Sequence, residues 1–156
     1  MREKRTLKSI FKQSKQSKSI SIHLKDEILI INPKSFTDTG LWKSHQPIIR
    51  ITNESDNTVI YDLILVAFNY SKHQIKHPEN PDESAKKYIK LLGYNSNSSF
   101  IKGNKLISIV EEKGIYEITI FRNNRTNFIG SDHENIIIKK EKDLVPAIRK
   151  AFELCE

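Results

Sequence analysis

The sequence predicts an α/β (α+β) fold, a single domain in which a mixed, mainly antiparallel sheet of about six strands carries three helices. Two observations lead to this fold class. Short segments in which polar and apolar residues alternate are separated by turn signals, which is typical of strands in a half-exposed sheet. Two further segments each join a strand, a polar turn and an amphipathic helix, so the chain contains two similar strand–helix units.

The second strand–helix unit closes the chain, at residues 134–156. Asn135–Lys139 is predicted to be a strand, because its three consecutive isoleucines have stiff side chains that suit a pleated sheet. Asp143 is expected to be the N-cap of the following helix, and Pro146 falls in the first turn of that helix. Apolar residues recur there at helical spacing and are expected to form one stripe: Leu144, Ala147, Ile148, Ala151 and Phe152.

The first unit has the same order of elements. Pro47–Thr52 is a predicted strand, residues 53–58 form a polar turn, and Val59–Lys72 is a predicted helix. Aligning the ends of the two helices makes three positions identical: Ile64 with Ile148, Ala67 with Ala151, and Phe68 with Phe152. Duplication of one unit and convergence of two helices on one sheet both explain this match. In either case, the first and last helices are expected to pack on the same face of the sheet.

The remaining elements complete the expected sheet. Ser19–Leu24 and Glu27–Ile31 are predicted to form a hairpin, with Pro33 ending its second strand. Asp82–Leu92 is a predicted helix, capped by Asp82 and stopped by Gly93. Three more segments are predicted strands, of which the last two form a hairpin: Ser99–Lys102, Leu106–Glu112 and Ile115–Phe121.

The positive charge of the chain is concentrated at its N-terminus. The net charge is +7, and residues 1–18 hold seven basic residues against one acidic residue, which leaves a net charge of +1 for the rest. We therefore divide the chain into a basic arm, residues 1–18, and one globular domain, residues 19–156, whose length is typical of a single domain. The arm is either a solvated tail or a contact for RNA or an anionic membrane surface.

No pattern in the sequence indicates catalysis, and we expect no catalytic residue, no metal site and no cofactor. The five glycines form no phosphate-binding loop, and the single cysteine, Cys155, is the penultimate residue. His73 and His77 are four residues apart, but Pro78 follows at once and no third ligand lies at a familiar spacing. Asp132 and His133 are adjacent in a loop, where a base and its orienting group rarely meet. These observations favour a binding protein over an enzyme.

The sequence also predicts where the protein acts. No apolar run reaches the roughly 20 residues needed to cross a bilayer, and no secretory leader opens the sequence. One cysteine cannot form an internal disulfide, so nothing requires an oxidising compartment. We expect a cytoplasmic protein with no membrane partner.

Five stretches of the domain, taken in order, carry a resemblance to a known family: SISIHLKDEILII, SFTDTGLW, PIIRITNESDNTVIYDLILVAFNYSK, KYIKLLGYNSNSSFIKGNKLISIVEEKGIYEITIF and DLVPAIRKAFELC. Their spacing and residue types resemble the CdiI-type bacterial immunity proteins, which protect a cell from the toxin of its own contact-dependent growth inhibition system. The residues 70–72 stand where the family ends a Leu- and Ala-rich helix. The chain departs from the family in charge, since many members are acidic and this one is basic.

The resemblance implies a stoichiometric inhibitor that binds one cognate toxin C-terminal domain, often a nuclease acting on tRNA, and covers its active site. It implies no direct contact with nucleic acid and leaves the oligomeric state open. Trp42, in a predicted long loop over Lys34–Gln46, either covers the core edge or anchors the interface. The candidate toxin contacts are Asp38, Trp42, Glu54, Asp56, Glu79, Asp132 and Glu134. The alternative is a nucleic-acid-associated module that uses the basic arm.

Overall fold

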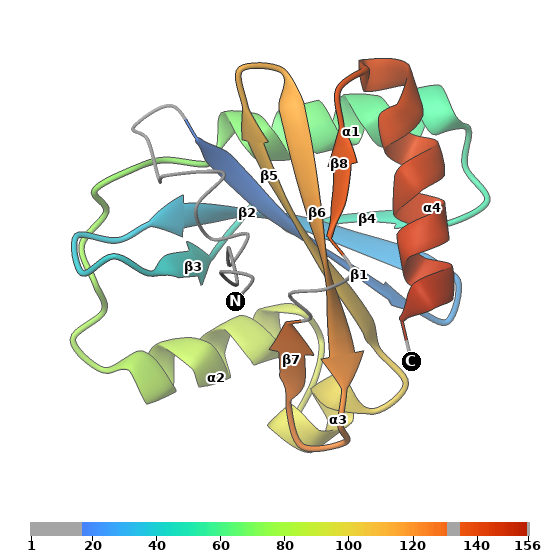
Figure 1. Cartoon of the computed structure of the whole chain (residues 1–156). Helices are drawn as coiled ribbons and strands as arrows, with labels where there is room; N and C mark the ends of the chain where they lie inside the picture. Colours follow the sequence, from blue (N-terminus) through green and yellow to red (C-terminus); the bar gives the residue numbers. More distant parts are fainter. Residues whose placement is uncertain (1–16, 131–134, 156) are drawn as a thin grey trace, which may run out of the picture.

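The computed structural model describes residues 17–130 and 135–155 of the chain (Figure 1). Eight strands form one twisted sheet in the order β3-β2-β1-β5-β6-β7, with β4 also beside β2 and β8 also beside β6. The strands are β1 (Lys18–Lys25), β2 (Ile28–Phe36), β3 (Trp42–Ser44), β4 (Ile49–Thr52), β5 (Lys105–Glu112), β6 (Ile115–Asn123), β7 (Phe128–Gly130) and β8 (Ile136–Ile138). The expected fold class is confirmed, and β3 and β7 are short strands that the sequence patterns did not indicate.

Helices cover both faces of this sheet. The helices α1 (Asn57–Asn69) and α4 (Leu144–Leu154) pack on one face, as expected, and enclose the main apolar core with the inward residues of β1, β2, β5 and β6. The helices α2 (Pro81–Leu91) and α3 (Asn97–Ile101) lie on the other side, and Figure 1 shows them across the sheet from α1. Each fully buried isoleucine of the main core contributes about 1.5–3 kcal/mol to stability.

The hairpin of β1 and β2 forms as the sequence predicted. Lys25 pairs with Ile28, so the loop is the two residues Asp26 and Glu27, and both have positive φ, at 51° and 60°. A two-residue loop with two positive φ values matches the right-handed twist of the flanking strands. The turn therefore fixes the register that places Ile20 and Ile22 in the core.

The prediction that Pro33 ends the second strand is wrong, because β2 continues to Phe36. The ladder between β2 and β4 ends at the pair Ile31–Ile49, and the ladder with β3 begins at Lys34–Ser44. Pro33 lies in the gap between these two ladders. Its carbonyl oxygen accepts a hydrogen bond on this side of β2, and its nitrogen points to the same side. Its missing N–H therefore removes no strand-to-strand hydrogen bond.

The predicted loop over Lys34–Gln46 is also corrected, since it contains the end of β2 and all of β3. The prediction of a strand at Ser99–Lys102 is likewise wrong, because this stretch holds the end of the helix α3, which was not predicted. The side chains of Ser96 and Ser99 each accept a hydrogen bond from the backbone N–H of the other, at 3.1 and 3.2 Å. This capping box is a local signal that starts a helix and overrides the short β-like pattern.

The helix α2 begins at a different residue from the one that the sequence suggested. The side chain of Asn80, not of Asp82, accepts the backbone N–H of Glu83 at 3.2 Å, and Pro81 takes the first helical position. A proline at this position costs nothing, since its missing N–H would have no intrahelical partner. The predicted N-cap of α4, Asp143, keeps its position but makes no side-chain cap bond, because a 3₁₀ turn (Glu141–Asp143) leads into the helix.

Replacing Asn80 by alanine is expected to lower the free energy of unfolding by about 1 kcal/mol, the usual cost of losing a side-chain N-cap. The matched change Asp82→Ala removes only an acidic residue from the first turn and is expected to cost a few tenths of a kcal/mol. Urea denaturation of both variants measures the difference. If Asp82→Ala lowers the free energy of unfolding more than Asn80→Ala does, the N-cap is Asp82 instead.

The second face of the sheet carries a polar row of five buried residues and the half-buried Lys34. The buried residues are Ser19, Ser21, His23, Asn32 and Ser108. The ammonium of Lys34 crosses β1 to donate to Ser108 Oγ at 2.9 Å, and burial lowers the pKa of Lys34 to about 8. His23 is 3% exposed, and within the described residues neither of its ring nitrogens has a hydrogen-bond partner. Burial, and then the charge of Lys34, lower the pKa of His23 to about 3, so its imidazole is neutral.

Candidate partner-binding groove

A groove runs between the edge strand β3 and the helix α2. Its deeper part has a volume of about 290 Å³, and a second hollow of about 340 Å³ continues it. The two parts share the lining residues Lys43, Ser44, Ser84 and Tyr88. The deeper part is further lined by Thr37, Leu41, Trp42, His77, Pro78, Pro81 and Ala85. Its lining combines aromatic and aliphatic side chains with a few polar groups, as is common in binding sites.

Trp42 is positioned in the groove by β3 and by two other rings. It pairs with Phe36 across the strands, and the two ring centroids are 5.1 Å apart. The imidazole of His73 packs edge-on against Trp42 at 5.6 Å. Trp42 is half-buried in consequence and lines the groove, and its role as an interface anchor stays a prediction.

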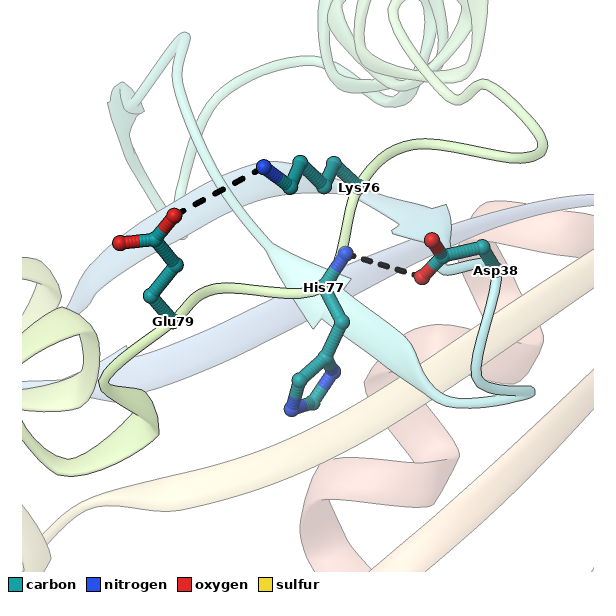
Figure 2. A network of polar contacts seen from close by, with 4 residues as sticks. All are labelled: Asp38, Lys76, His77 and Glu79. Atoms are coloured by element: carbon teal, nitrogen blue, oxygen red, sulfur yellow. Dashed lines mark hydrogen bonds and ion pairs between the residues drawn. The ribbon is translucent and has the colours of Figure 1, made fainter.

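The rim of the groove is the chain between α1 and α2, and it is tied to the end of β2. Phe36 N donates to Lys72 O at 2.8 Å, Ile75 N donates to Phe36 O at 3.1 Å, and Asp38 N donates to Ile75 O at 2.9 Å. The Asp38 carboxylate in turn accepts the backbone N–H of His77 at 3.0 Å (Figure 2). The rim is therefore held by backbone hydrogen bonds on both sides and needs little ordering when a partner binds.

The floor of the groove is fixed by a buried hydrogen bond. The hydroxyl of Tyr88 donates to Oδ1 of Asn32 at 2.9 Å, and Asn32 is fully buried on β2. Burial raises the pKa of Tyr88 above its usual value, so the phenol stays protonated and remains a donor. This bond joins α2 to the sheet and keeps the groove at a set width.

The structure brings together three of the predicted contacts and separates the others. Asp38, Trp42 and Glu79 lie at or beside the groove, and Glu79 forms an exposed ion pair with Lys76 at 3.7 Å, drawn in Figure 2. Glu54 and Asp56 lie in the turn between β4 and α1, at the other end of β2. Asp132 and Glu134 fall outside the described residues.

Glu54 and Asp56 belong to an acidic end of the domain that sequence reasoning found only in part. Asn53 N donates to Glu27 O at 2.8 Å, which sets the turn of residues 53–56 beside the hairpin turn of Asp26 and Glu27. Four carboxylates therefore gather on two adjacent turns. Their nearness depends on the pairing of β2 with β4, which no local sequence signal shows.

Arg149 of α4 holds this acidic end in place. Its guanidinium donates to Asn53 O at 2.6 Å, to Ser55 O at 3.0 Å and to Asn57 Oδ1 at 3.2 Å. Guanidinium groups suit such a role, because several donors in one plane reach several acceptors at once. No pattern in the sequence indicated this role for Arg149.

Changing Arg149 to alanine is expected to lower the free energy of unfolding by about 1–2 kcal/mol, since hydrogen bonds from a charged donor are lost. Lys150→Ala is the matched control, because Lys150 is the next residue on α4 and is exposed. Its removal is expected to change stability by less than about 0.5 kcal/mol. Equal losses in the two variants, measured by chemical denaturation, would contradict the bonding role of Arg149.

The polar groups of the groove have separate partners. His77 Nδ1 lies 3.0 Å from the hydroxyl of Thr39, but Asp38 contacts the backbone of His77 rather than its ring. The ring of His73 contacts the carbonyl oxygen of Ser17 and packs against both Phe36 and Trp42. Within residues 17–130 and 135–155, no three His, Cys, Asp or Glu side chains come together as metal ligands would. None of the helices described has the length and apolar character required to span a bilayer.

No protein-family model matches this chain, and no curated protein matches it. The solved structures that are similar include the following two. A protein of unknown function from Neisseria meningitidis has a TM-score of 0.71 and 15% identity, covering 92% of this chain and 98% of its own. A chain of a CdiA-CT/CdiI toxin and immunity complex from Yersinia pseudotuberculosis has a TM-score of 0.69 and 13% identity. The match covers 90% of the present chain and 98% of the chain from the complex.

The chain has a CdiI-like fold. At 13–15% identity this likeness concerns the fold alone, and it extends over nearly the whole domain. The CdiI-like fold is the one that the sequence resemblance implied. The groove and the acidic end are the two surfaces that hold the predicted contacts within the described residues.

Proposed function

We propose that this protein is an immunity protein that binds and neutralises the toxin domain of a contact-dependent growth inhibition system. The observation that carries the proposal is the shared fold, which covers 90% of this chain and 98% of a chain from a toxin and immunity complex. The groove supports it, because an aromatic side chain and a fixed rim suit the docking of a protein segment. Such a role requires no catalytic group.

We further propose that the toxin domain is a nuclease acting on tRNA, that this protein covers its active site, and that it does so in the cytoplasm. A nuclease site that binds phosphates is positively charged, and complementary charge on an inhibitor speeds association and selects the partner. The acidic end, with Asp26, Glu27, Glu54 and Asp56, supplies such charge although the whole chain is basic.

The proposal is tested by co-expressing this chain with the toxin domain encoded immediately upstream of its own gene. We expect growth to be restored, and a one-to-one complex to survive size-exclusion chromatography. A toxin with an inactivating change in its active site is the control for expression. Growth that stays arrested while both proteins are soluble would overturn the proposal, and so would rescue without any complex, since that would indicate an enzymatic antidote.

A second candidate function is nucleic-acid binding, and one observation favours it. A hollow of about 590 Å³ is lined by Lys102, Lys105 and Arg125, and no carboxylate is among its lining residues. Lys105 also donates to the carbonyl of Phe152 at 3.1 Å, so it already caps the end of α4. The basic arm would add charge, although residues 1–16 lie outside the described residues.

This second function predicts RNA or DNA binding that weakens steeply with salt. A gel shift at about 50 mM salt, where contacts to phosphates are strongest, tests it with arbitrary RNA and DNA. Two variants distinguish the contributions of the arm and of the hollow to this binding. One lacks residues 1–15, and the other combines Lys102→Ala with Arg125→Ala. No shift at this salt concentration would exclude the candidate.

A further inference from the structure

The outer flank of α1 carries an apolar stripe that is exposed at three of its four residues, while the fourth, Leu63, is half-buried and packs against the main core. The stripe consists of Val59, Leu63, Val66 and Tyr70, and the exposed fractions of Val59, Val66 and Tyr70 are 46%, 43% and 49%. It is distinct from the face of α1 that enters the core, which uses Ile60, Ile64, Ala67 and Phe68. Asp62 is the single charged residue of this 13-residue helix. A helix that is apolar beyond its core face is typical of one that packs against a further partner.

The spacing of the stripe indicates what kind of partner fits it. Its members are separated by four, three and four residues, which is the spacing of the contact seam in a coiled coil. The pattern is also symmetric about the midpoint of the helix, between Ile64 and Leu65. In an antiparallel pair of two α1 helices, Val59 meets Tyr70 of the second copy, and Leu63 meets Val66 of the second copy. Each apolar residue thus finds an apolar residue, as an isologous contact requires.

The charges at the two ends of α1 are complementary in the same arrangement. Asp56 stands at the N-cap of α1, yet its side chain makes no cap bond. Lys72 lies just beyond the C-terminal end and is exposed. Among the described residues neither side chain takes part in an ion pair. In the antiparallel pair, the end of each α1 that carries Asp56 lies beside the end of the other that is followed by Lys72, and the helix dipoles are opposed as well.

We propose that this protein forms a two-fold symmetric homodimer through α1. The seam is short, so the dimer is weak, with a dissociation constant on the order of 10–100 µM. The seam residues are not among those that line the groove, and α1 and α2 lie on opposite sides of the sheet. The dimer therefore leaves the groove open, and the inference does not depend on the function proposed above.

Sedimentation equilibrium of the full chain from about 10 to about 500 µM tests the proposal, because this range brackets the expected dissociation constant. We expect the average mass to rise from that of the monomer toward that of the dimer. Val66→Glu places two carboxylates in the seam and is expected to weaken the dimer by about 100-fold or more. Leu65→Glu is the matched control, since Leu65 is 38% exposed on the same helix but lies off the seam.

A charge exchange tests the pairing itself. Asp56→Lys and Lys72→Asp each place like charges opposite one another at two symmetric positions, and each is expected to weaken the dimer by about tenfold. The double variant is expected to restore the wild-type dissociation constant of the dimer, because both ion pairs form again with their charges exchanged. Circular dichroism confirms that all variants fold. A chain that stays monomeric to about 500 µM, an equal effect of Leu65→Glu, or no restoration in the double variant would each overturn the proposal.

Discussion

Acidification from pH 7 to pH 5 is expected to lower the free energy of unfolding by about 2 kcal/mol through His23 alone. The folded pKa of His23 is about 3, against 6.5 for an unperturbed histidine. Between these values the unfolded chain binds a proton that the folded chain does not. The contribution of His23 to the free energy of unfolding is therefore fully present above about pH 6.5 and is lost as pH decreases. The free energy of unfolding falls by about 1.4 kcal/mol per pH unit, and this dependence ends near the folded pKa.

Two substitutions of His23 separate its charge from its unmet hydrogen bonds. His23→Leu removes both, so we expect about 1–2 kcal/mol of added stability at pH 7 and a loss of the acid slope. Glutamine does not titrate but is still a buried polar group. His23→Gln is therefore expected to reduce the dependence of the free energy of unfolding on pH without adding stability at pH 7. Denaturant unfolding at pH 7 and pH 5 measures both effects.

His45 adds to the acid sensitivity in the same direction. Burial lowers the pKa of His45, with a smaller opposing effect from its hydrogen bond to Gln46. Because this histidine is present in the wild type and in both variants, the difference between them isolates His23. An acid slope that survives unchanged in His23→Leu and His23→Gln would assign the effect to another group.

Trp42→Ala is expected to weaken binding of the toxin domain by about 30-fold or more, equivalent to about 2 kcal/mol. The indole packs against the rings of Phe36 and His73 and is the largest side chain lining the groove, so its removal opens a gap in the surface that a partner would cover. Isothermal titration calorimetry against the purified toxin domain measures the change. Thermal unfolding of the variant shows that the protein titrated is folded.

The acidic end provides the control for this measurement. Glu54→Ala removes a carboxylate at the opposite end of β2 and is expected to change the affinity by less than about threefold, mainly through the association rate. The reverse outcome, full binding by Trp42→Ala and a large loss in Glu54→Ala, would move the interface to the acidic end. Because the two surfaces are separated by the length of β2, the pair of variants discriminates between them.

Several elements could be predicted because neighbouring residues determine them. The hairpin of β1 and β2 was predicted from two adjacent strand patterns and is confirmed, although its turn lies at Asp26 and Glu27, one residue later than the expected strand bounds imply. The stripes of α1 and α4 showed which sides of these helices are buried, and both helices pack on one face of the sheet. Such features follow from residue spacing within one segment, which the sequence displays directly.

Other elements could not be predicted, since they depend on contacts between distant segments. Pro33 is tolerated within β2 because β3 and β4 happen to leave a gap beside it. Trp42 lies on a strand because Phe36 pairs with it, in a segment whose composition is typical of a loop. The helix α3 was missed for a different reason, as its serine capping box was present in the sequence and was not recognised.

The predicted contacts illustrate the same division. Residue type alone selected exposed carboxylates and a tryptophan, and the structure then divided them between the groove and the acidic end.

Sequence patterns were sufficient to predict the fold class, the buried faces of the main helices and the basic character of the arm, because periodicity and composition are local properties. The set of side chains that share a surface depends instead on the three-dimensional arrangement of the strands. Strand pairing joins residues that are far apart in the chain, and the groove, the acidic end and the unpartnered imidazole of His23 all arise from that pairing.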